Sequence, residues 1–190
     1  MDDKKRSITL SAINVFQEKG IEKAKVSDIV KGAGIAQGTF YLYFPSKLSV
    51  MPSIAEVMVE KTLEELTKNI DEKASFKIQL EQLINSVFEL TKNYREILAL
   101  IYAGLASSEH LQEWEAIYEP YYAQIDKMLN RALINGEIRQ SIQTKQIASI
   151  LLGLIESAAD QSYLYDSQND EKIAQKKRDV FEFATHALFN

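Results

Sequence analysis

Apolar residues recur every three or four positions along nearly the whole sequence, a spacing that places them on one face of an α-helix. No segment alternates apolar and polar residues between turn signals, as a half-buried β-strand would. The pattern predicts an all-α protein, with one helix ending at Gly20, one beginning at Lys47, and others at 27–33, 37–44, 76–93, 94–106, 109–135, 144–165 and 170–189. Pro120 lies inside the 109–135 segment, where the loss of one backbone hydrogen bond predicts a kink or a break.

The composition narrows the possible classes of protein. The chain has no cysteine among its 190 residues, which excludes disulfides, thiol catalysis and thiolate metal sites and fits a reducing cytoplasm. The N-terminal segment lacks the apolar core of a signal peptide. The longest apolar run, residues 147–155, is far short of the roughly 20 residues that a membrane-spanning helix needs. We therefore expect a soluble cytoplasmic protein without a membrane partner.

Charge is unevenly distributed along the chain, whose formal net charge is −5. Residues 1–50 carry eight Lys and Arg against five Asp and Glu, a charge of +3, whereas the remainder carries 14 against 22, a charge of −8. A basic head on an acidic body can direct one end of a protein toward a polyanion such as DNA. A chance fluctuation within a short window would produce the same imbalance.

The segment GIAQGTFYLYFPSK, residues 34–47, lies between two predicted helices and concentrates two glycines, four aromatics and a proline. Three short helices in the first 45 residues, with a tight turn between the second and third, are the outline of a helix-turn-helix unit. Gly34 would take the positive-φ position that ends the second helix. Phe40 and Phe44, four residues apart, share one face of the third helix and would be buried.

The remaining surface of this third helix indicates a partner. It leaves to solvent a set of residues that mere packing would not need: Gln37, Gly38, Thr39, Tyr41, Leu42 and Tyr43. A Gln can pair with adenine and a Thr methyl can contact the thymine methyl, while a bare glycine lets the backbone approach a phosphate. Tyrosine hydroxyls and Lys47 could hold phosphates and fix the register. The alternative is a three-helix packing module whose aromatics all belong to the core.

The order and spacing of residues 12–51 resemble the N-terminal domain of the TetR family of bacterial transcriptional regulators. The matching positions are Ala12, Phe16, Gly20, Val26, Asp28, Ile29, Ala33, Gly34, Gly38, Phe40, Tyr41, Tyr43, Phe44, Ser46 and Lys47. The resemblance implies a helix-turn-helix DNA-binding domain at 1–46, joined to a larger helical effector-binding and dimerisation domain at 47–190. It also implies a ligand-responsive homodimer, usually a repressor, that binds a palindromic double-stranded DNA operator and is released by a small molecule.

One position departs from the family pattern. The family often has Ser or Thr immediately before the valine that opens the second helix, whereas this chain has Lys25. Lys25 could contact a phosphate through its charge, and the helix cap would then come from elsewhere, with Ser27 as a candidate. The predicted DNA-binding residues are Lys25, Ser27, Gln37, Gly38, Thr39, Tyr41, Leu42, Tyr43 and Lys47.

The last two predicted helices carry broad apolar faces that could pack against the chain's own core or against a second copy. Two such helices from each of two chains would form a four-helix bundle across a two-fold axis, and the family resemblance favours this arrangement. The predicted dimer-interface residues are Ile147, Leu151, Leu154, Ala158, Val180, Phe181, Ala184 and Leu188.

The middle helices are rich in large aromatic side chains, which suit a pocket for an apolar or aromatic small molecule but are also common in ordinary cores. The predicted pocket residues are Phe88, Tyr102, Trp114, Tyr118, Tyr121 and Ile155. Glu156, on a strongly apolar helix, could pair with a cationic ligand, point to solvent or face the partner chain. The identity of the effector does not follow from the sequence.

An enzyme and a protein-binding helical module are the competing classes. The two histidines, His110 and His186, lie on different predicted helices and in no metal-ligand or catalytic-triad spacing, and the sequence has no phosphate-binding glycine loop. We therefore predict no catalytic residues, no metal site and no cofactor. A protein-binding bundle would not require the exposed set around Gly38, and the steep salt dependence of DNA binding would distinguish the two.

Overall fold

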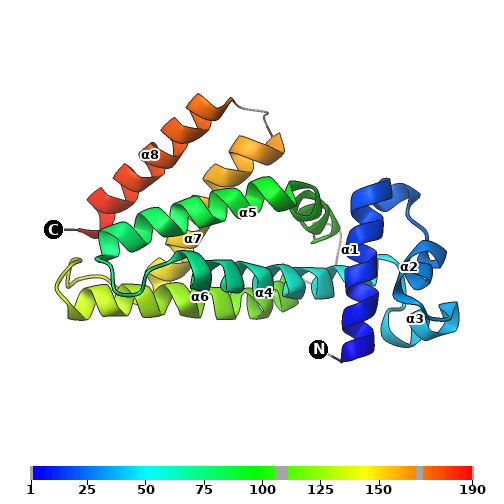
Figure 1. The fold of residues 1–190 in the computed structure, drawn as a ribbon. Coiled ribbons are helices and arrows are strands. Elements are labelled where there is room, and N and C mark those ends of the chain that lie inside the picture. Colours follow the sequence, from blue (N-terminus) through cyan, green and yellow to red (C-terminus); the bar gives the residue numbers. More distant parts are fainter. Residues whose placement is uncertain (1, 106–110, 166–168, 190) are drawn as a thin grey trace. The chain divides into compact units, whose positions relative to one another are not determined.

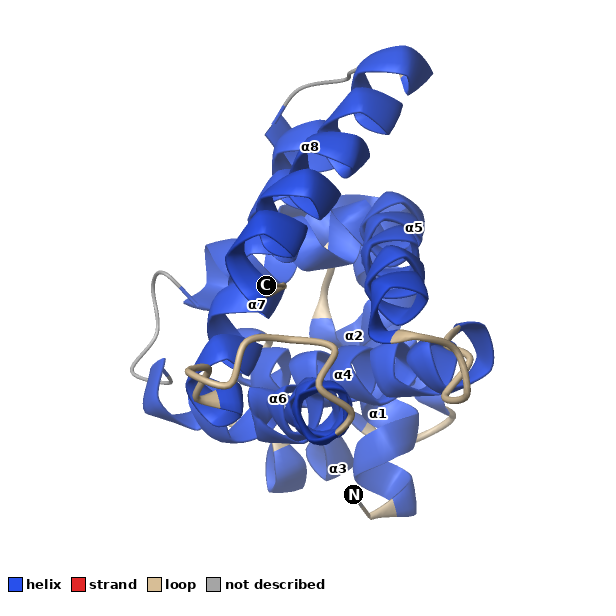
Figure 2. Cartoon of the chain, turned by 90° about the vertical axis from the view of Figure 1, so that its left-hand side faces the viewer, coloured by secondary structure: helices blue, strands red, loops and turns tan. Residues whose placement is uncertain are grey.

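The computed structural model describes residues 2–105, 111–165 and 169–189, and their side chains except at 103–105 and 111–115. Every regular element in this part of the chain is a helix, which confirms the predicted all-α fold (Figure 1, Figure 2). In chain order the elements are α1 (Asp3–Lys23), α2 (Val26–Ala33), α3 (Gln37–Tyr43), the 3₁₀ turn η1 (Leu48–Val50), α4 (Met51–Asn69), α5 (Phe76–Leu105), α6 (Leu111–Ile134), α7 (Thr144–Asp160), the π-helical turn η2 (Gln161–Tyr165) and α8 (Asp170–Leu188).

The chain divides into two compact units. The first consists of Met1–Met58 with Glu96–Ile117, and the second of Val59–Arg95 with Tyr118–Asn190. Helices α4, α5 and α6 therefore each begin in one unit and end in the other. The domain boundary expected between residues 46 and 47 stays a prediction.

Both glycines predicted to end helices in the N-terminal segment have positive φ, although α1 continues past Gly20 to Lys23. Gly20 leaves the helical conformation near the end of α1, with φ 72° and ψ 156°, and Gly34 ends α2 in the left-handed region at φ 66°. After Gly34, the Ile35 N–H donates to the Val30 carbonyl at 3.0 Å, which closes the turn before α3. The apolar stripes of α1, α2 and α3 then form a shared core of fully or nearly fully buried residues: Ile8, Ala12, Phe16, Ile29, Phe40 and Phe44.

The long helices differ from the predicted segments at three points. The predicted separation between residues 93 and 94 appears as a local departure from helical geometry at Tyr94, with φ −117° and ψ 16°, inside the single helix α5. Helix α6 runs through Pro120, so the helix is not broken there. The predicted 144–165 helix is α7 followed directly by η2. Among the described residues, no helix combines the length and the apolarity required to cross a bilayer.

In the second unit, the segment after α6 contacts the beginning of α5 and the end of α8. The Glu137 carboxylate accepts from the Phe76 N–H at 2.6 Å, which satisfies a backbone donor at the start of α5. The Arg139 N–H donates to the Leu188 carbonyl at 2.9 Å, and the Phe76 and Phe189 rings stack with centroids 5.8 Å apart. The segment after α6 thereby connects the beginning of α5 with the end of α8.

Candidate DNA-binding surface and effector region

The turn between α1 and α2 is fixed by Asp28, the third residue of α2. Its carboxylate accepts from the backbone N–H of Lys25 at 3.1 Å and pairs with the Lys19 ammonium at 2.8 Å. These contacts, with Lys19 first, lower the pKa of Asp28. The cap of α2 therefore comes from Asp28, and the expectation that Ser27 supplies it is wrong. The three-residue spacing from Lys25 to Asp28 is that of a capping box and could have been recognised in the sequence.

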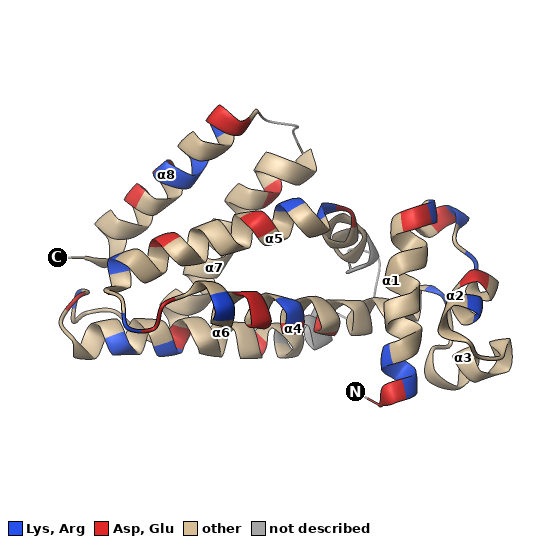
Figure 3. Cartoon of the chain, in the orientation of Figure 1, with Lys and Arg blue, Asp and Glu red and all other residues tan. Residues whose placement is uncertain are grey.

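Helix α3 buries one side chain and presents most of the others outward. Phe40 is fully buried, with its ring 5.5 Å from the Tyr41 ring and 5.6 Å from the Phe44 ring, centroid to centroid. Leu42 is 83% exposed and Tyr41 is 50% exposed. The helix carries no charged residue, in contrast to α1 and α2 (Figure 3). The expectation that this surface faces away from the core agrees with these exposures.

The remaining α3 residues also lie at or near the surface. Gln37 and Gly38 are exposed, and Thr39 and Tyr43 are half-buried. A Cβ atom at Gly38 would meet no other atom within 4 Å. The chain's own packing therefore does not require a glycine at this position. On α2 and its cap, Ser27 and Lys25 are exposed.

Tyr43 is tied to the N-terminus of the chain. Its hydroxyl donates to the Asp2 carboxylate at 2.9 Å, while the other carboxylate oxygen of Asp2 accepts from the Lys4 N–H at 3.2 Å and caps α1. The hydrogen bond with Tyr43 is the main cause of a lowered pKa at Asp2 and of a raised pKa at Tyr43. This contact spans 41 residues, and sequence reasoning offered no signal for it.

Lys47 is half-buried and its ammonium points back toward the end of α1. It donates to the Ile21 carbonyl and, at 2.8 Å, to the Ala24 carbonyl. An ammonium has three N–H donors, so two of the three are directed at backbone within the chain. The sequence placed Lys47 among the phosphate contacts, whereas its position here is that of a cation at a helix C-terminus.

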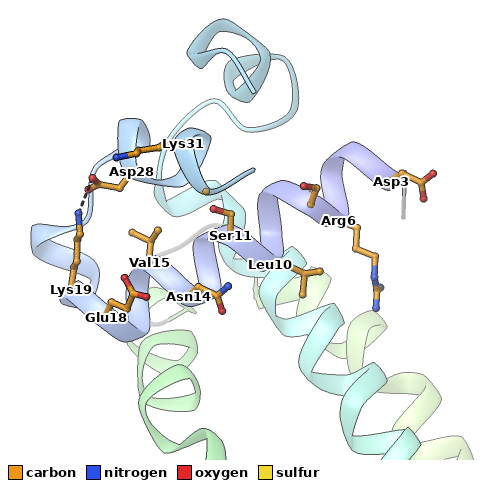
Figure 4. Close-up of a pocket in the computed structure, with 12 residues that line it drawn as sticks. Asp3, Arg6, Leu10, Ser11, Asn14, Val15, Glu18, Lys19, Asp28 and Lys31 are labelled. Atoms are coloured by element: carbon orange, nitrogen blue, oxygen red, sulfur yellow. Dashed lines mark ion pairs between the residues drawn. The ribbon is translucent and has the colours of Figure 1, made fainter. Parts of the chain in front are cut away.

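Helices α1 and α2 face each other across an open groove of about 740 Å³ (Figure 4). Acidic and basic side chains line it together, among them Asp3, Glu18, Lys19 and Lys31. On its wall, the Ser11 hydroxyl of α1 donates to the Ile29 carbonyl of α2 at 2.7 Å. The two helices approach so closely here that a Cβ atom at Gly32 would lie 2.3 Å from the Ser11 oxygen.

The predicted pocket residues are distributed over both units. Phe88, Tyr118, Tyr121 and Ile155 belong to the second unit and are buried. The Tyr118 and Tyr121 ring centroids lie 6.2 Å apart, and the Phe88 ring contacts Tyr163 edge to face at 6.3 Å. Tyr102 is half-buried and belongs to the first unit. Trp114 lies outside the residues whose side chains the structure describes. A pocket at this aromatic set stays a prediction.

Glu156 lies on α7, one turn before the buried Asp160. Desolvation and, secondly, the negative charge of Asp160 raise the pKa of Glu156 to about 8. Its carboxyl group is therefore mostly protonated at neutral pH and can donate a hydrogen bond.

A second groove, of about 420 Å³, runs between α5 and α8 within the second unit. Lys77, Lys177 and Arg178 supply cations to it, Glu81 and Glu182 supply carboxylates, and Ile84 and Phe181 supply apolar surface. The Lys177 ammonium lies 5.4 Å from the centroid of the buried Phe88 ring and 3.9 Å from the Glu89 carboxylate. The groove thus brings positive charge close to an apolar interior. Among the described residues, no cluster of His, Asp and Glu could hold a metal ion.

Comparison with known proteins assigns the chain to a family. Residues 80–188 match the model described as "Tetracyclin repressor-like, C-terminal domain", and residues 8–52 match "Bacterial regulatory proteins, tetR family". The chain belongs to the TetR family. Its TetR helix-turn-helix therefore covers α1 to α3, and its C-terminal domain is of the tetracyclin-repressor-like type. These families are transcriptional regulators rather than enzymes, so the prediction of a DNA-binding transcriptional regulator is confirmed.

Individual relatives share this TetR architecture over nearly their full length. The uncharacterized HTH-type transcriptional regulator YvdT of Bacillus subtilis (strain 168) is 39% identical over 185 residues, which cover 97% of this chain and 95% of the relative. The fatty acid metabolism regulator protein of the same organism is 27% identical over 182 residues, or 95% and 93% of the two chains. A crystal structure of the transcriptional regulator FadR from Bacillus subtilis in complex with stearoyl-CoA superposes with a TM-score of 0.72 at 26% identity, covering 93% of this chain and 95% of that one.

The eight apolar residues of α7 and α8 predicted for the TetR dimer interface differ in their exposure. Five of the eight predicted dimer residues are buried within the chain itself and offer little surface to a second copy: Leu151, Ala158, Val180, Ala184 and Leu188. Ile147, Leu154 and Phe181 are half-buried. The large apolar side chains that α7 and α8 leave exposed are Ile150, at 64%, and Phe183, at 65%. The apolar periodicity of the sequence indicated how broad each apolar face is, but not which of its residues the chain's own core covers.

Proposed function

We propose that the chain is a homodimeric repressor that binds a palindromic DNA operator and leaves it when a long-chain acyl-CoA binds the helical body. In this proposal each copy of α3 enters the major groove, at successive grooves about 34 Å apart. Gln37 and Thr39 meet base edges, whereas Lys25, Ser27 and the Tyr41 hydroxyl contact phosphates. Since its partner is DNA, we place its action in the cytoplasm.

The observation that carries the DNA-binding part is the outward surface of α3. Leu42 and Tyr41 are exposed on a helix whose Phe40 is fully buried, and Gly38 has open space where a side chain would lie. Large apolar side chains that the core leaves uncovered mark interaction sites, and a glycine beside them admits a phosphate or a base edge closely. The competing interpretation is a protein-binding surface, which would not lose affinity steeply with salt.

We propose that dimerisation uses the exposed apolar side chains of α7 and α8, Ile150 and Phe183. They lie on two adjacent helices of the second unit, together with the half-buried Leu154 and Phe181. Two such helix pairs form a four-helix bundle when they pack about a two-fold axis. This arrangement replaces most of the interface predicted from periodicity alone.

The acyl-CoA part of the proposal is supported by a relative and by the chemistry of the α5–α8 groove. The FadR protein of Bacillus subtilis, 26% identical, was crystallised with stearoyl-CoA. Lys77, Lys177 and Arg178 offer positive charge for a phosphorylated headgroup beside apolar walls. The buried Phe88, next to the Lys177 ammonium, offers an apolar environment of the kind an acyl chain requires.

The experiment begins by selecting binding sites for the purified protein from random duplex DNA. Enrichment of a palindrome, with an affinity that falls steeply as salt rises, would support an operator-binding dimer. No enrichment by an intact dimer would contradict the DNA-binding proposal and favour a protein partner.

The effector is then tested by fluorescence anisotropy of the selected duplex. Stearoyl-CoA should release the protein at concentrations at which free CoA and stearate separately do not. Arg178→Ala should weaken the response to stearoyl-CoA, whereas Lys172→Ala, which alters an exposed lysine of the same helix, should leave it unchanged. Release by stearate alone, or no release by stearoyl-CoA, would contradict the proposed effector class.

A further inference from the structure

We infer that Lys47 is a positioning residue for DNA binding, which holds the end of α1 to the connector after α3, rather than a phosphate contact. The inference rests on the proposed DNA-binding function. Lys47 follows α3 by four residues and lies just before η1. Its ammonium donates to the carbonyls of Ile21 and Ala24, which are 26 and 23 residues away in the sequence.

The two carbonyls lie where α1 ends and α2 begins. Helix C-termini leave carbonyl groups without partners inside the helix, and these groups form the negative end of the helix dipole. A cation that donates to them satisfies both requirements. Ala24 is only 2% exposed, so its carbonyl has little access to water while the ammonium is in place. Moving Lys47 to a phosphate would therefore cost the unit two charge-assisted hydrogen bonds.

Holding this connector matters because α3 is too short to keep its own geometry. A seven-residue helix is not stable in isolation, so its orientation depends on how both ends are attached. The front end is attached by the turn at Gly34, whose φ is 66°. The rear end is attached by the buried Phe44 and by reciprocal hydrogen bonds between Ser46 and Ser49, at 3.0 Å and 3.2 Å. Lys47 links this rear attachment to the α1–α2 turn.

The test compares Lys47→Ala, Lys47→Gln and Lys25→Ala in the full chain, with the duplex that the wild type enriches. Affinity is measured as a function of salt, and hydrogen exchange of residues 20–26 is measured without DNA. Gln keeps amide donors for the carbonyls but removes the charge. Lys25→Ala removes an exposed lysine proposed to contact a phosphate and serves as the comparison.

We expect Lys47→Ala to weaken binding by about tenfold or more, in keeping with the loss of hydrogen bonds to a charged group, and to speed exchange in residues 20–26. Its salt slope should stay unchanged, whereas Lys25→Ala should lower the slope by about 1.8, because the proposed dimer loses one phosphate contact in each subunit, at about 0.9 per contact. Lys47→Gln should recover part of both affinity and protection.

A salt slope that falls by about 1.8 in both Lys47 variants, which is one lost contact per subunit, with exchange unchanged, would make Lys47 a phosphate contact and overturn the inference. Lys47→Gln remains informative even if Lys47→Ala fails to fold, because its slope alone separates the two roles. Failure of the wild type to select any duplex would refute the proposed function, whereas the exchange measurement would still report on the Lys47 contact itself.

Discussion

The contact between Gly32 and Ser11 makes a quantitative prediction about the packing of α1 against α2. An alanine Cβ at position 32 would lie 2.3 Å from the Ser11 hydroxyl oxygen, far inside normal contact distance, but 3.5 Å from the Ser11 Cβ, which is ordinary contact. The hydroxyl is buried and donates to the Ile29 carbonyl at 2.7 Å. Gly32→Ala must therefore displace the hydroxyl from its acceptor.

The magnitude follows from two opposing terms. A buried hydroxyl deprived of its partner costs about 1–3 kcal/mol of stability. Replacing glycine by alanine inside a helix returns about 0.5–1 kcal/mol. In the wild-type background Gly32→Ala should therefore destabilise the N-terminal helices. After Ser11→Ala has removed the hydroxyl, only the favourable helix term remains and Gly32→Ala should stabilise them. The coupling between the two substitutions should be about 1–3 kcal/mol.

Native-state hydrogen exchange of the α1 and α2 amides is the appropriate assay, because it reports the stability of these helices separately from the second unit. The four proteins of the double-mutant cycle are compared. Gly38→Ala serves as the matched control: it is also a helical glycine, but its added Cβ meets nothing within 4 Å, so it should show no coupling to Ser11. Equal effects of Gly32→Ala in the two backgrounds would refute the reasoning.

Three further predictions follow from the site and the body. Gly38→Ala should not lower the unfolding midpoint, because the added Cβ meets open space. If DNA backbone approaches this glycine closely, the substitution should weaken binding to the selected duplex by about tenfold or more. Unchanged affinity in fluorescence anisotropy would contradict this prediction. The pKa of Glu156 is raised from 4.5 to about 8 in the folded chain, so its stabilisation is complete below pH 4.5 and is lost as the pH rises toward 8. Glu156→Gln should therefore be more stable than the wild type at pH 8, and its denaturation midpoint should depend less on pH. Parallel curves of midpoint against pH for the two proteins would contradict the raised pKa of Glu156. Phe183→Glu should yield monomers by light scattering, whereas Ile134→Glu, at an 84% exposed position on α6, should stay dimeric; a dimeric Phe183→Glu would exclude this face from the interface.

The N-terminal head could be predicted closely from the sequence because its determinants are local. The helix-ending glycines, Gly20 and Gly34, act through their own backbone conformation, and the four-residue spacing of Phe40 and Phe44 fixes which face of α3 is buried. The same spacing identified the outward surface of α3 that we propose binds DNA. The capping role of Asp28 was also readable, since it depends on a three-residue spacing.

The body was less predictable because its faces are broad. Periodicity identified α7 and α8 and their apolar residues, but a residue such as Leu151 or Val180 can be covered by the chain's own core or by a partner with the same sequence pattern. The choice depends on which helices pack together, and this placed Ile150 and Phe183 at the surface. The pKa of Glu156 likewise depends on desolvation by groups distant in the sequence.

The sequence by itself determined the helical class, the helix-turn-helix and the outward surface of α3, because these depend on residues within a few positions of one another. Only the tertiary structure decided what the ammonium of Lys47 and the hydroxyl of Tyr43 contact, since their acceptors lie at least 23 residues away. From the sequence alone, a charged side chain near a predicted DNA-binding surface is readily interpreted as a phosphate contact. Which partner it holds depends on the carbonyls and carboxylates that folding brings within reach.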